Sequence, residues 1–284
     1  MKFANIDGIR CEATTSGQRG ICPGCGSEVV AKCGRVKVNH WAHLSGKDCD
    51  SWHEPEKEWH RMWKNQFPLE WQEKDFVDKA TGEHHRADVH TPHGLTIEFQ
   101  HSAIKPEERE ARENFYSSEG SMIWVVDGTR LESSWDRFIQ NTICLHSIKG
   151  LPSYILQSQA PHAILPRDWL ENSIPLFFDF LGTLSPNEVE IERIPLLCVL
   201  PPVPNAPEYT FFIIISREEF ISLCKNGTCI SWLQKQRNAI YNIVDQRWRE
   251  TPTPPPIPEV SVIIRGQKFI VSPARPRKKF LYLP

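Results

Sequence analysis

Two short strand-like runs that each carry a carboxylate most constrain the fold of this 284-residue chain. Residues 84–90 (HHRADVH) and 95–101 (LTIEFQH) alternate polar and apolar side chains, and the TPHG between them is typical of a turn. Successive side chains of a strand point to opposite faces. If the apolar sides of the two runs match, Asp88, Glu98 and Gln100 project from the same side of a hairpin.

Two carboxylates on one face, with no cation evident beside them, repel each other and resist burial. A divalent cation removes this conflict. Mg²⁺ favours one or two carboxylates, several waters and the phosphate oxygens of a substrate, and such an ion can activate water for attack on a phosphodiester. The alternative is an exposed sheet face on which both acids are solvated, because such alternation is common on half-buried strands.

The neighbouring segments predict a mixed sheet with helices packed on it. Aromatic and apolar residues recur at helical spacing within residues 53–67, and a strand is predicted over 69–77, ahead of the hairpin. A helix over 105–120 and a buried strand over 121–128 follow the hairpin. The order is therefore helix, three strands, helix and strand, which is an α+β core built on a mixed α/β sheet.

A cluster of cysteines near the N-terminus indicates a metal site rather than disulfides. Four of the nine cysteines lie within the first 33 residues, and the N-terminal residues have no apolar run typical of an export signal. Cys22 and Cys25 form a C-x₂-C knuckle, which zinc completes with two further ligands. The candidates for these two ligands are Cys33, His40, His43 and Cys49. A closed set of four would be a structural zinc site that stabilises a region with little apolar content.

Several segments together resemble one known family. They are EWHRMWKNQFP (58–68), RADV (86–89), IEFQHS (97–102), REARENFY (109–116) and WVVDG (124–128). In this order they resemble the nuclease core of the competence protein CoiA family, within the PD-(D/E)XK, or restriction-endonuclease-like, superfamily. The resemblance covers roughly residues 20–130. It implies an αβββαβ restriction-endonuclease-like core with an N-terminal zinc-binding region and a C-terminal accessory domain.

The resemblance also implies roles for the residues of the hairpin. Asp88 corresponds to the D of the superfamily motif, Glu98 to its (D/E), and Gln100 stands where the motif has lysine. Asp88 and Glu98 would hold Mg²⁺ or Mn²⁺, while the neutral amide of Gln100 would orient the attacking water by hydrogen bonds. Glu58 on the preceding helix would complete the metal site, and His60 would act as a general acid or contact a phosphate.

Two further groups of residues complete the prediction. Lys64 on the helix is an expected contact to a phosphate of the substrate, and Ser102, which shares the strand face of Gln100, is an expected phosphate or water contact. The sequence HWAH followed by a cysteine resembles the N-terminal segment of the family, and this favours His43 and Cys49 as the second pair of zinc ligands. The predicted zinc set is therefore Cys22, Cys25, His43 and Cys49, with His40 and Cys33 as the alternates.

Composition divides the chain into four parts. Residues 1–50 are the Cys/His zinc-binding region, and residues 51–147 are the nuclease core. Residues 148–250 form an accessory domain of unknown role, and residues 251–284 contain a Pro-rich linker, a short hairpin and a basic tail. A basic tail can follow a phosphate backbone, and the last two parts are where a protein partner is expected to bind.

These observations predict a metal-dependent deoxyribonuclease that hydrolyses DNA phosphodiester bonds in DNA uptake, recombination or defence against foreign DNA. The alternative is a non-catalytic DNA-binding accessory protein on a nuclease fold, which the missing motif lysine favours. The pair of Asp88 and Glu98 favours the nuclease, because a pure binder of a polyanion needs no such acids. No apolar run is long enough to span a membrane, so a cytoplasmic protein is expected.

Overall fold

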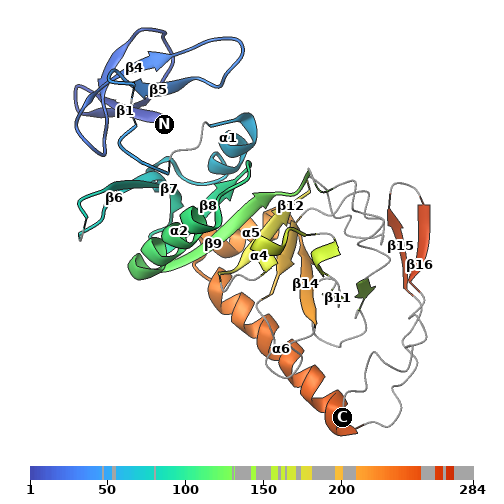
Figure 1. The fold of residues 1–284 in the computed structure, drawn as a ribbon. Helices are drawn as coiled ribbons and strands as arrows, with labels where there is room; N and C mark the ends of the chain where they lie inside the picture. Colours follow the sequence, from blue (N-terminus) through green and yellow to red (C-terminus); the bar gives the residue numbers. More distant parts are fainter. Residues whose placement is uncertain are drawn as a thin grey trace. The chain divides into compact units, whose positions relative to one another are not determined.

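The computed structural model divides the chain into two compact units, Met1–Ile123 and Trp124–Pro284 (Figure 1). The predicted zinc region and most of the predicted nuclease core therefore share the first unit. The structure describes residues 1–46, 48–52, 56–79, 81–129, 131, 142–144, 155–158, 161–163, 165–170, 174–180, 196–200, 209–250, 260–264 and 267–271. The predicted Pro-rich linker and basic tail lie outside these residues, and the four-part division by composition stays a prediction.

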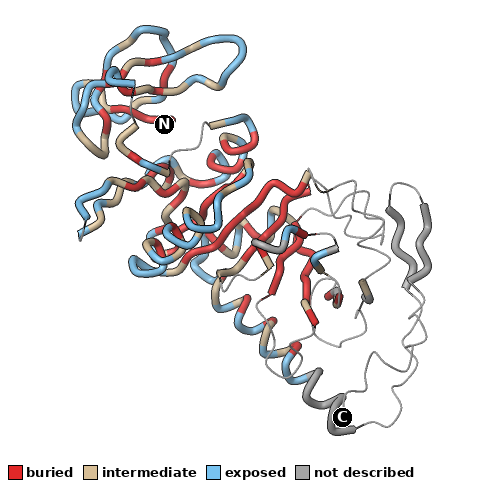
Figure 2. Tube along the Cα trace, in the orientation of Figure 1, coloured by how far each residue is buried: buried red, intermediate tan, exposed pale blue. Residues whose placement is uncertain are grey.

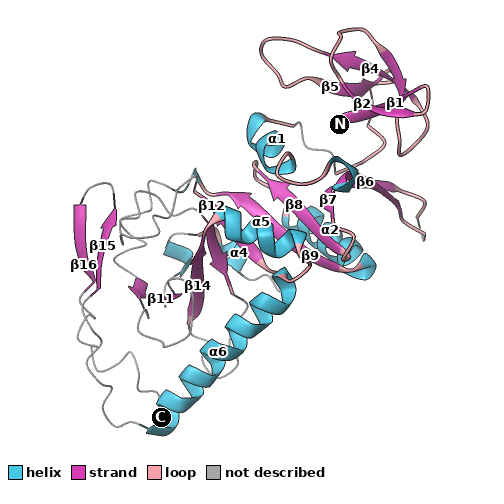
Figure 3. Ribbon diagram, turned by 180° about the vertical axis from the view of Figure 1, so that it is seen from behind, coloured by secondary structure: helices cyan, strands magenta, loops and turns pink. Residues whose placement is uncertain are grey.

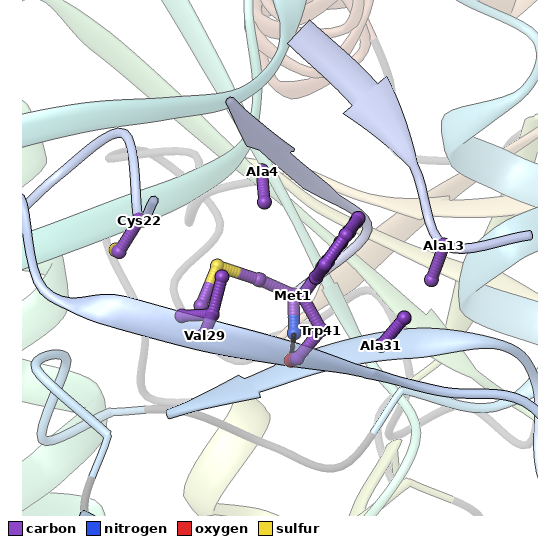
Figure 4. Packing of buried hydrophobic residues seen from close by; sticks show 7 residues of the cluster. All are labelled: Met1, Ala4, Ala13, Cys22, Val29, Ala31 and Trp41. Carbon is purple, nitrogen blue, oxygen red and sulfur yellow. Dashed lines mark hydrogen bonds between the residues drawn. The ribbon is translucent and has the colours of Figure 1, made fainter. Parts of the chain in front are cut away.

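The first unit begins with a small five-stranded antiparallel sheet in the order β2-β1-β3-β4-β5. Its strands are β1 (Phe3–Ile6), β2 (Ile9–Glu12), β3 (Arg19–Ile21), β4 (Glu28–Lys32) and β5 (His40–His43). Seven residues form its buried core, and Trp41 is the only large aromatic among them (Figure 4). The other core residues are Met1, Ala4, Ala13, Cys22, Val29 and Ala31. A core this small contributes little hydrophobic free energy, so the sheet depends on other contacts.

The predicted order of helix, three strands, helix and strand follows, and the α+β class is confirmed. The elements are α1 (Glu58–Lys64), the short 3₁₀ helix η1 (Leu69–Trp71), β6 (Gln72–Val77), β7 (His84–His90), β8 (Leu95–Gln100), α2 (Pro106–Glu119) and β9 (Ser121–Asp127). Strand β7 pairs antiparallel with both β6 and β8. Helices α1 and α2 lie beside these strands (Figure 3). Trp63 on α1 stacks on Phe99 of β8 with ring centroids 5.5 Å apart, which anchors that helix to the sheet.

The second unit contains a sheet whose strands are ordered β10-β11-β14-β13-β12-β9. Its own strands are β10 (Thr142–Cys144), β11 (Ile155–Ser158), β12 (Leu176–Asp179), β13 (Leu196–Val199) and β14 (Thr210–Ile215). Only the β12–β9 pair is parallel; the other four pairs that join these strands are antiparallel. Strands β12 and β13 are buried along their whole length, which Figure 2 shows in red for β12. Such continuous burial is typical of strands covered on both faces.

The helices that the structure describes in this unit are η3 (Pro161–Ala163), α4 (Arg167–Leu170), α5 (Arg217–Lys225) and α6 (Cys229–Glu250). Ser216 caps α5, because its side chain accepts a hydrogen bond from the backbone N–H of Glu219. The predicted C-terminal hairpin is confirmed as the antiparallel pair β15 (Val260–Ile264) and β16 (Gln267–Val271). Within the described residues, no helix combines the length and the hydropathy needed to cross a lipid bilayer.

Candidate metal centres

The β7–β8 hairpin brings Asp88 and Glu98 together. Val89 pairs with Ile97, so the apolar sides of the two strands match as predicted. The backbone N–H of Asp88 donates to Oε1 of Glu98 at 3.1 Å, and the N–H of Phe99 donates to Oδ2 of Asp88 at 3.0 Å. Each carboxylate is thus held by the backbone of the opposite strand.

Glu98 is buried, with a relative exposure of 3%, so the alternative of a solvated sheet face is wrong for this residue. Burial, and then the neighbouring charge of Asp88, raise the pKa of Glu98 to about 8, although Arg112 acts in the opposite direction. The Nη1 atom of Arg112 donates to Oε2 of Glu98 at 3.2 Å. A divalent cation would relieve the remaining repulsion between the two acids, so this donor set suits a hard metal ion.

Asp88 and Glu98 line a pocket with room of about 50 Å³, enough for an ion with a few waters. The charged groups of its lining include five carboxylates but only three Lys or Arg side chains and the N-terminal ammonium group of Met1. The side chains are Asp50, Glu56, Glu73, Asp88 and Glu98, with Lys64, Arg86 and Arg112. The pocket therefore has an excess of acids when all of them are ionised, as a cation-binding site requires.

The structure places two of the predicted catalytic and substrate residues of α1 at this pocket. His60 and Lys64 are both buried and both line it. Glu58 does not line it, because α1 begins at Glu58 and turns that side chain toward solvent. Glu56, two residues earlier, lines the pocket, where it pairs with Lys64. The buried side of α1 also carries Trp59, which fixes this orientation of the helix.

Gln100 and Ser102 are not among the residues that line the pocket. Gln100 is buried, with a relative exposure of 3%, and its Nε2 donates to the backbone oxygen of Ser102 at 3.0 Å. Glu98 therefore lines the pocket, whereas Gln100, on the same polar face of β8, does not. The roles predicted for Gln100 in orienting water and for Ser102 in binding phosphate stay predictions.

Sequence reasoning missed Glu73 and Arg112. Glu73 has a left-handed backbone (φ 49°), a conformation uncommon for residues other than glycine, and its carboxylate accepts the N–H of Lys2 at 2.7 Å. This contact joins the first strand of the small sheet to the pocket. The sequence places Arg112 on the predicted helix over 105–120. Its pairing with Glu98 follows only from the packing of α2 on β8.

The four predicted zinc ligands come together in the small sheet. The ligand atoms of Cys22, Cys25, His43 and Cys49 all lie within 4.8 Å of one another. The Sγ atoms of Cys22 and Cys49 are 3.8 Å apart, and Sγ of Cys25 is 3.3 Å from Nε2 of His43. A tetrahedron with Zn–S bonds of about 2.3 Å has S–S edges of about 3.8 Å, so this donor set fits zinc. The alternates His40 and Cys33 lie outside the cluster.

The C-x₂-C knuckle is shaped by its own backbone. The N–H of Cys22 donates to the oxygen of Ser27 at 2.8 Å, and the N–H of Gly26 donates to the oxygen of Cys22 at 3.0 Å. Gly26 adopts a φ of 72°, which favours glycine. Burial raises the pKa of Cys25, but hydrogen bonds with Ser27, His43 and Cys22 outweigh it and lower this pKa to about 6. A thiolate at neutral pH is the form that binds metal.

The cysteine cluster and the acid pocket share neighbouring residues. Arg86 lines the pocket, and its Nη2 lies 3.4 Å from Sγ of Cys22. Asp50 directly follows the ligand Cys49, and its Oδ2 accepts the backbone N–H of Arg86 at 3.2 Å. Residues beside metal ligands orient those ligands. The metal cluster therefore lies close enough to hold one wall of the pocket.

Comparisons with known proteins relate the chain to one family. Residues 9–51 match the family model described as "Competence protein CoiA, N-terminal domain", and residues 60–162 match "Competence protein CoiA, nuclease-like domain". The competence protein CoiA of Bacillus subtilis (strain 168) is 28% identical over 132 residues, which cover 43% of this chain and 35% of that protein. The match thus spans about a third of the relative's length. No solved structure matches the chain.

Proposed function

Because this chain belongs to the CoiA-like family and has its nuclease-like fold, we propose that it is a metal-dependent deoxyribonuclease that hydrolyses DNA phosphodiester bonds. The observation that carries the proposal is the pair of Asp88 and Glu98. The ionised form of a buried glutamate beside a second acid, in a pocket with more acids than cations, is unfavourable without a bound cation. Perturbed groups of this kind cluster at functional sites.

The residues of the pocket fit distinct parts of this chemistry. When bound, Mg²⁺ or Mn²⁺ would supply an activated water and stabilise charge on the phosphodiester. Asp88 and Glu98 would hold the ion, and Arg112 keeps Glu98 in place. His60, buried in the lining, is positioned to give a proton to the leaving oxygen or to contact a phosphate, and Lys64 offers a positive charge to the same phosphate.

The second metal in this proposal is a structural zinc ion. Cys22, Cys25, His43 and Cys49 supply all four ligands of a tetrahedron, so no position is left for water or substrate. The sheet that carries them has only seven residues in its core. Zinc binding would therefore supply folding free energy that this core lacks.

The biological setting is proposed from the relative, whose name assigns it to competence. Handling of incoming DNA inside the cell would place the protein in the cytoplasm, with DNA as its partner. The same chemistry would serve defence against foreign DNA. A further protein partner that binds through residues 148–284 belongs to the same proposal.

A second candidate function is a DNA-binding accessory protein without catalytic activity. The observation that favours it is Gln100, which stands at the position of the motif lysine and does not line the pocket. An amide there supplies no positive charge to stabilise an attacking hydroxide. The acids of the pocket argue against this second function, because carboxylates repel a polyanion.

Cleavage of labelled single- and double-stranded DNA with Mg²⁺ or Mn²⁺ tests the proposal. Asp88→Asn and Glu98→Gln should each lower the rate at least about 100-fold, because each removes a ligand of the ion. Glu110→Gln, an exposed glutamate on α2, is the matched control and should cleave as the wild type does. No cleavage by the wild type with any divalent ion, together with retained DNA binding, would establish the accessory function instead.

A further inference from the structure

Lys64 on helix α1 is enclosed by carboxylates from three separate segments. Its Nζ lies 2.6 Å from Oε1 of Glu56, 2.8 Å from Oε1 of Glu73 and 3.7 Å from Oδ1 of Asp88. The side chain is 3% exposed. An ammonium group surrounded by oxygens in this way occupies the kind of position that a metal ion takes in a carboxylate cage.

Glu56 and Glu73 are already occupied by protein partners. The second oxygen of Glu56 pairs with Arg61, and Glu73 also accepts the backbone N–H groups of Lys2 at 2.7 Å and Phe3 at 3.2 Å. These two acids therefore hold the ammonium group of Lys64 in place and have little capacity left for a metal ion. Several of these partners are charged, and such hydrogen bonds are stronger than neutral ones.

Asp88 differs from these two holders. Its side chain is 22% exposed, and its Oδ1 lies at the longer distance of 3.7 Å from Lys64. Asp88 can therefore offer Oδ1 to a metal ion shared with Glu98, while its Oδ2 stays on the N–H of Phe99 and Lys64 stays beside it. A phosphate oxygen that approaches such an ion at Asp88 also comes near the Lys64 ammonium group, which is the place where positive charge stabilises a developing phosphorane.

The charges of the pocket lining point to the same arrangement. Five carboxylates face three Lys or Arg side chains and the N-terminal ammonium group of Met1, which leaves one negative charge when all these groups are ionised. One divalent ion more than neutralises this excess, whereas a second would have to displace Lys64 from its three acids. Gln100, with its amide bonded to the backbone oxygen of Ser102, adds no charge.

We propose that Lys64 supplies from helix α1 the positive charge that Gln100 does not supply from β8, and that it thereby limits the pocket to one divalent ion. The inference rests on the proposed nuclease function. It assigns Lys64 to the reacting phosphate and Glu56 and Glu73 to the positioning of Lys64.

The number of bound ions tests the inference without any cleavage. Mn²⁺ is titrated into the zinc-loaded full-length chain by calorimetry, with Asp88→Asn defining the background outside the pocket. The wild type and Lys64→Arg should bind one ion in the pocket, and Lys64→Met should bind two, because one oxygen of each of three acids then loses the ammonium group beside it. The control is Lys37→Met, an exposed lysine outside the pocket. Two ions in the wild type, or one in Lys64→Met, overturns the inference.

Cleavage kinetics supply the second test. Lys64→Met should lower kcat about 100- to 1,000-fold with KM changed less than tenfold, the range seen when one stabilising group is removed. Lys64→Arg, which keeps the positive charge, should retain at least tenfold more activity than Lys64→Met, which a merely structural lysine would not require. If Lys64→Met does not fold, Glu56→Gln combined with it removes an opposing charge, and the same loss of kcat is expected.

The outcomes separate this inference from the proposed function. Equal cleavage rates of the wild type and Lys64→Met would contradict the inference but would still support the proposed nuclease activity. The opposite outcome is a wild type that cleaves no DNA but binds one Mn²⁺ ion, while Lys64→Met binds two. This outcome contradicts the proposed nuclease activity and supports the assignment of Lys64 as the cation that limits metal binding.

Discussion

At the scale of single residues, the chemistry of the pocket depends on how the Glu98 carboxylate is held. Strand alternation placed Asp88 and Glu98 on one face from the sequence, because a strand has a fixed period. Alternation could not show that Arg112 of α2 closes over Glu98 and buries it. Nor could it find Glu73, whose left-handed backbone departs from the strand pattern. Strand alternation therefore predicted the positions of the two acids, whereas their partners depend on contacts between residues distant in the sequence.

The raised pKa of Glu98 predicts how the stability of the protein without added divalent ion depends on pH. The folded-state pKa of about 8 lies above the ordinary value of 4.5, so folding favours the protonated form. This stabilisation is complete below pH 4.5 and is lost as the pH rises through about 8. Relative to Glu98→Gln, the free energy of unfolding of the wild type should fall by about 2 kcal/mol between pH 6 and pH 8.

Urea denaturation at pH 6, 7 and 8 measures this difference. The exposed control Glu110→Gln should follow the wild type at each pH. Mg²⁺ added at pH 8 should stabilise the wild type and leave Glu98→Gln almost unchanged, because the ion binds the ionised carboxylate. Parallel curves for the wild type and Glu98→Gln across this range would show that Glu98 titrates normally.

At the scale of elements, the predictions held where turn and periodicity signals agreed. The hairpin over 84–90 and 95–101 was confirmed because alternation and the TPHG turn point to the same structure. The strand predicted over 69–77 begins instead as a 3₁₀ turn at Leu69–Trp71, directly after Pro68. Glu58 was predicted from its position in the motif and not from the orientation of the helix. The prediction therefore did not include Glu56, which lines the pocket.

The small sheet is the element whose stability depends most on a metal. Cys49→Ser removes one of four ligands from the cluster and should abolish tight zinc binding. Because apparent zinc-binding free energies of small domains reach about 10 kcal/mol, the sheet should then unfold locally. Hydrogen exchange should show lost protection in β3, β4 and β5, with protection in β12, β13 and β14 retained.

Cys33→Ser is the matched control for this prediction. Cys33 is a partly buried cysteine that packs against the same core, but it lies outside the cluster. It should keep one zinc ion per chain, measured by atomic absorption, and normal exchange in all five strands. Equal zinc content in Cys49→Ser and Cys33→Ser would assign the cluster a role other than metal binding.

At the scale of the whole molecule, packing groups the predicted zinc region and most of the predicted nuclease core into one compact unit, and the four-part division by composition stays a prediction. The boundary between the two compact units falls inside β9, between Ile123 and Trp124. The second half of β9 pairs in parallel with β12, about 50 residues later in the sequence. No local pattern indicates such a pairing, because a parallel partner is separated by a long crossover.

The β9–β12 pair predicts that the nuclease core cannot be isolated by cutting the chain after Gly128. Trp124, Val125 and Val126 are buried, and this cut removes the strand that pairs with them. An unpaired apolar strand edge promotes aggregation. The fragment 1–128 should therefore elute as aggregates or oligomers, whereas a fragment 1–250, which keeps β12, β13 and β14, should behave as the full chain does. Sedimentation velocity at micromolar concentration measures the difference. A monomeric 1–128 fragment that binds one Mn²⁺ would show that the first unit is complete without β12.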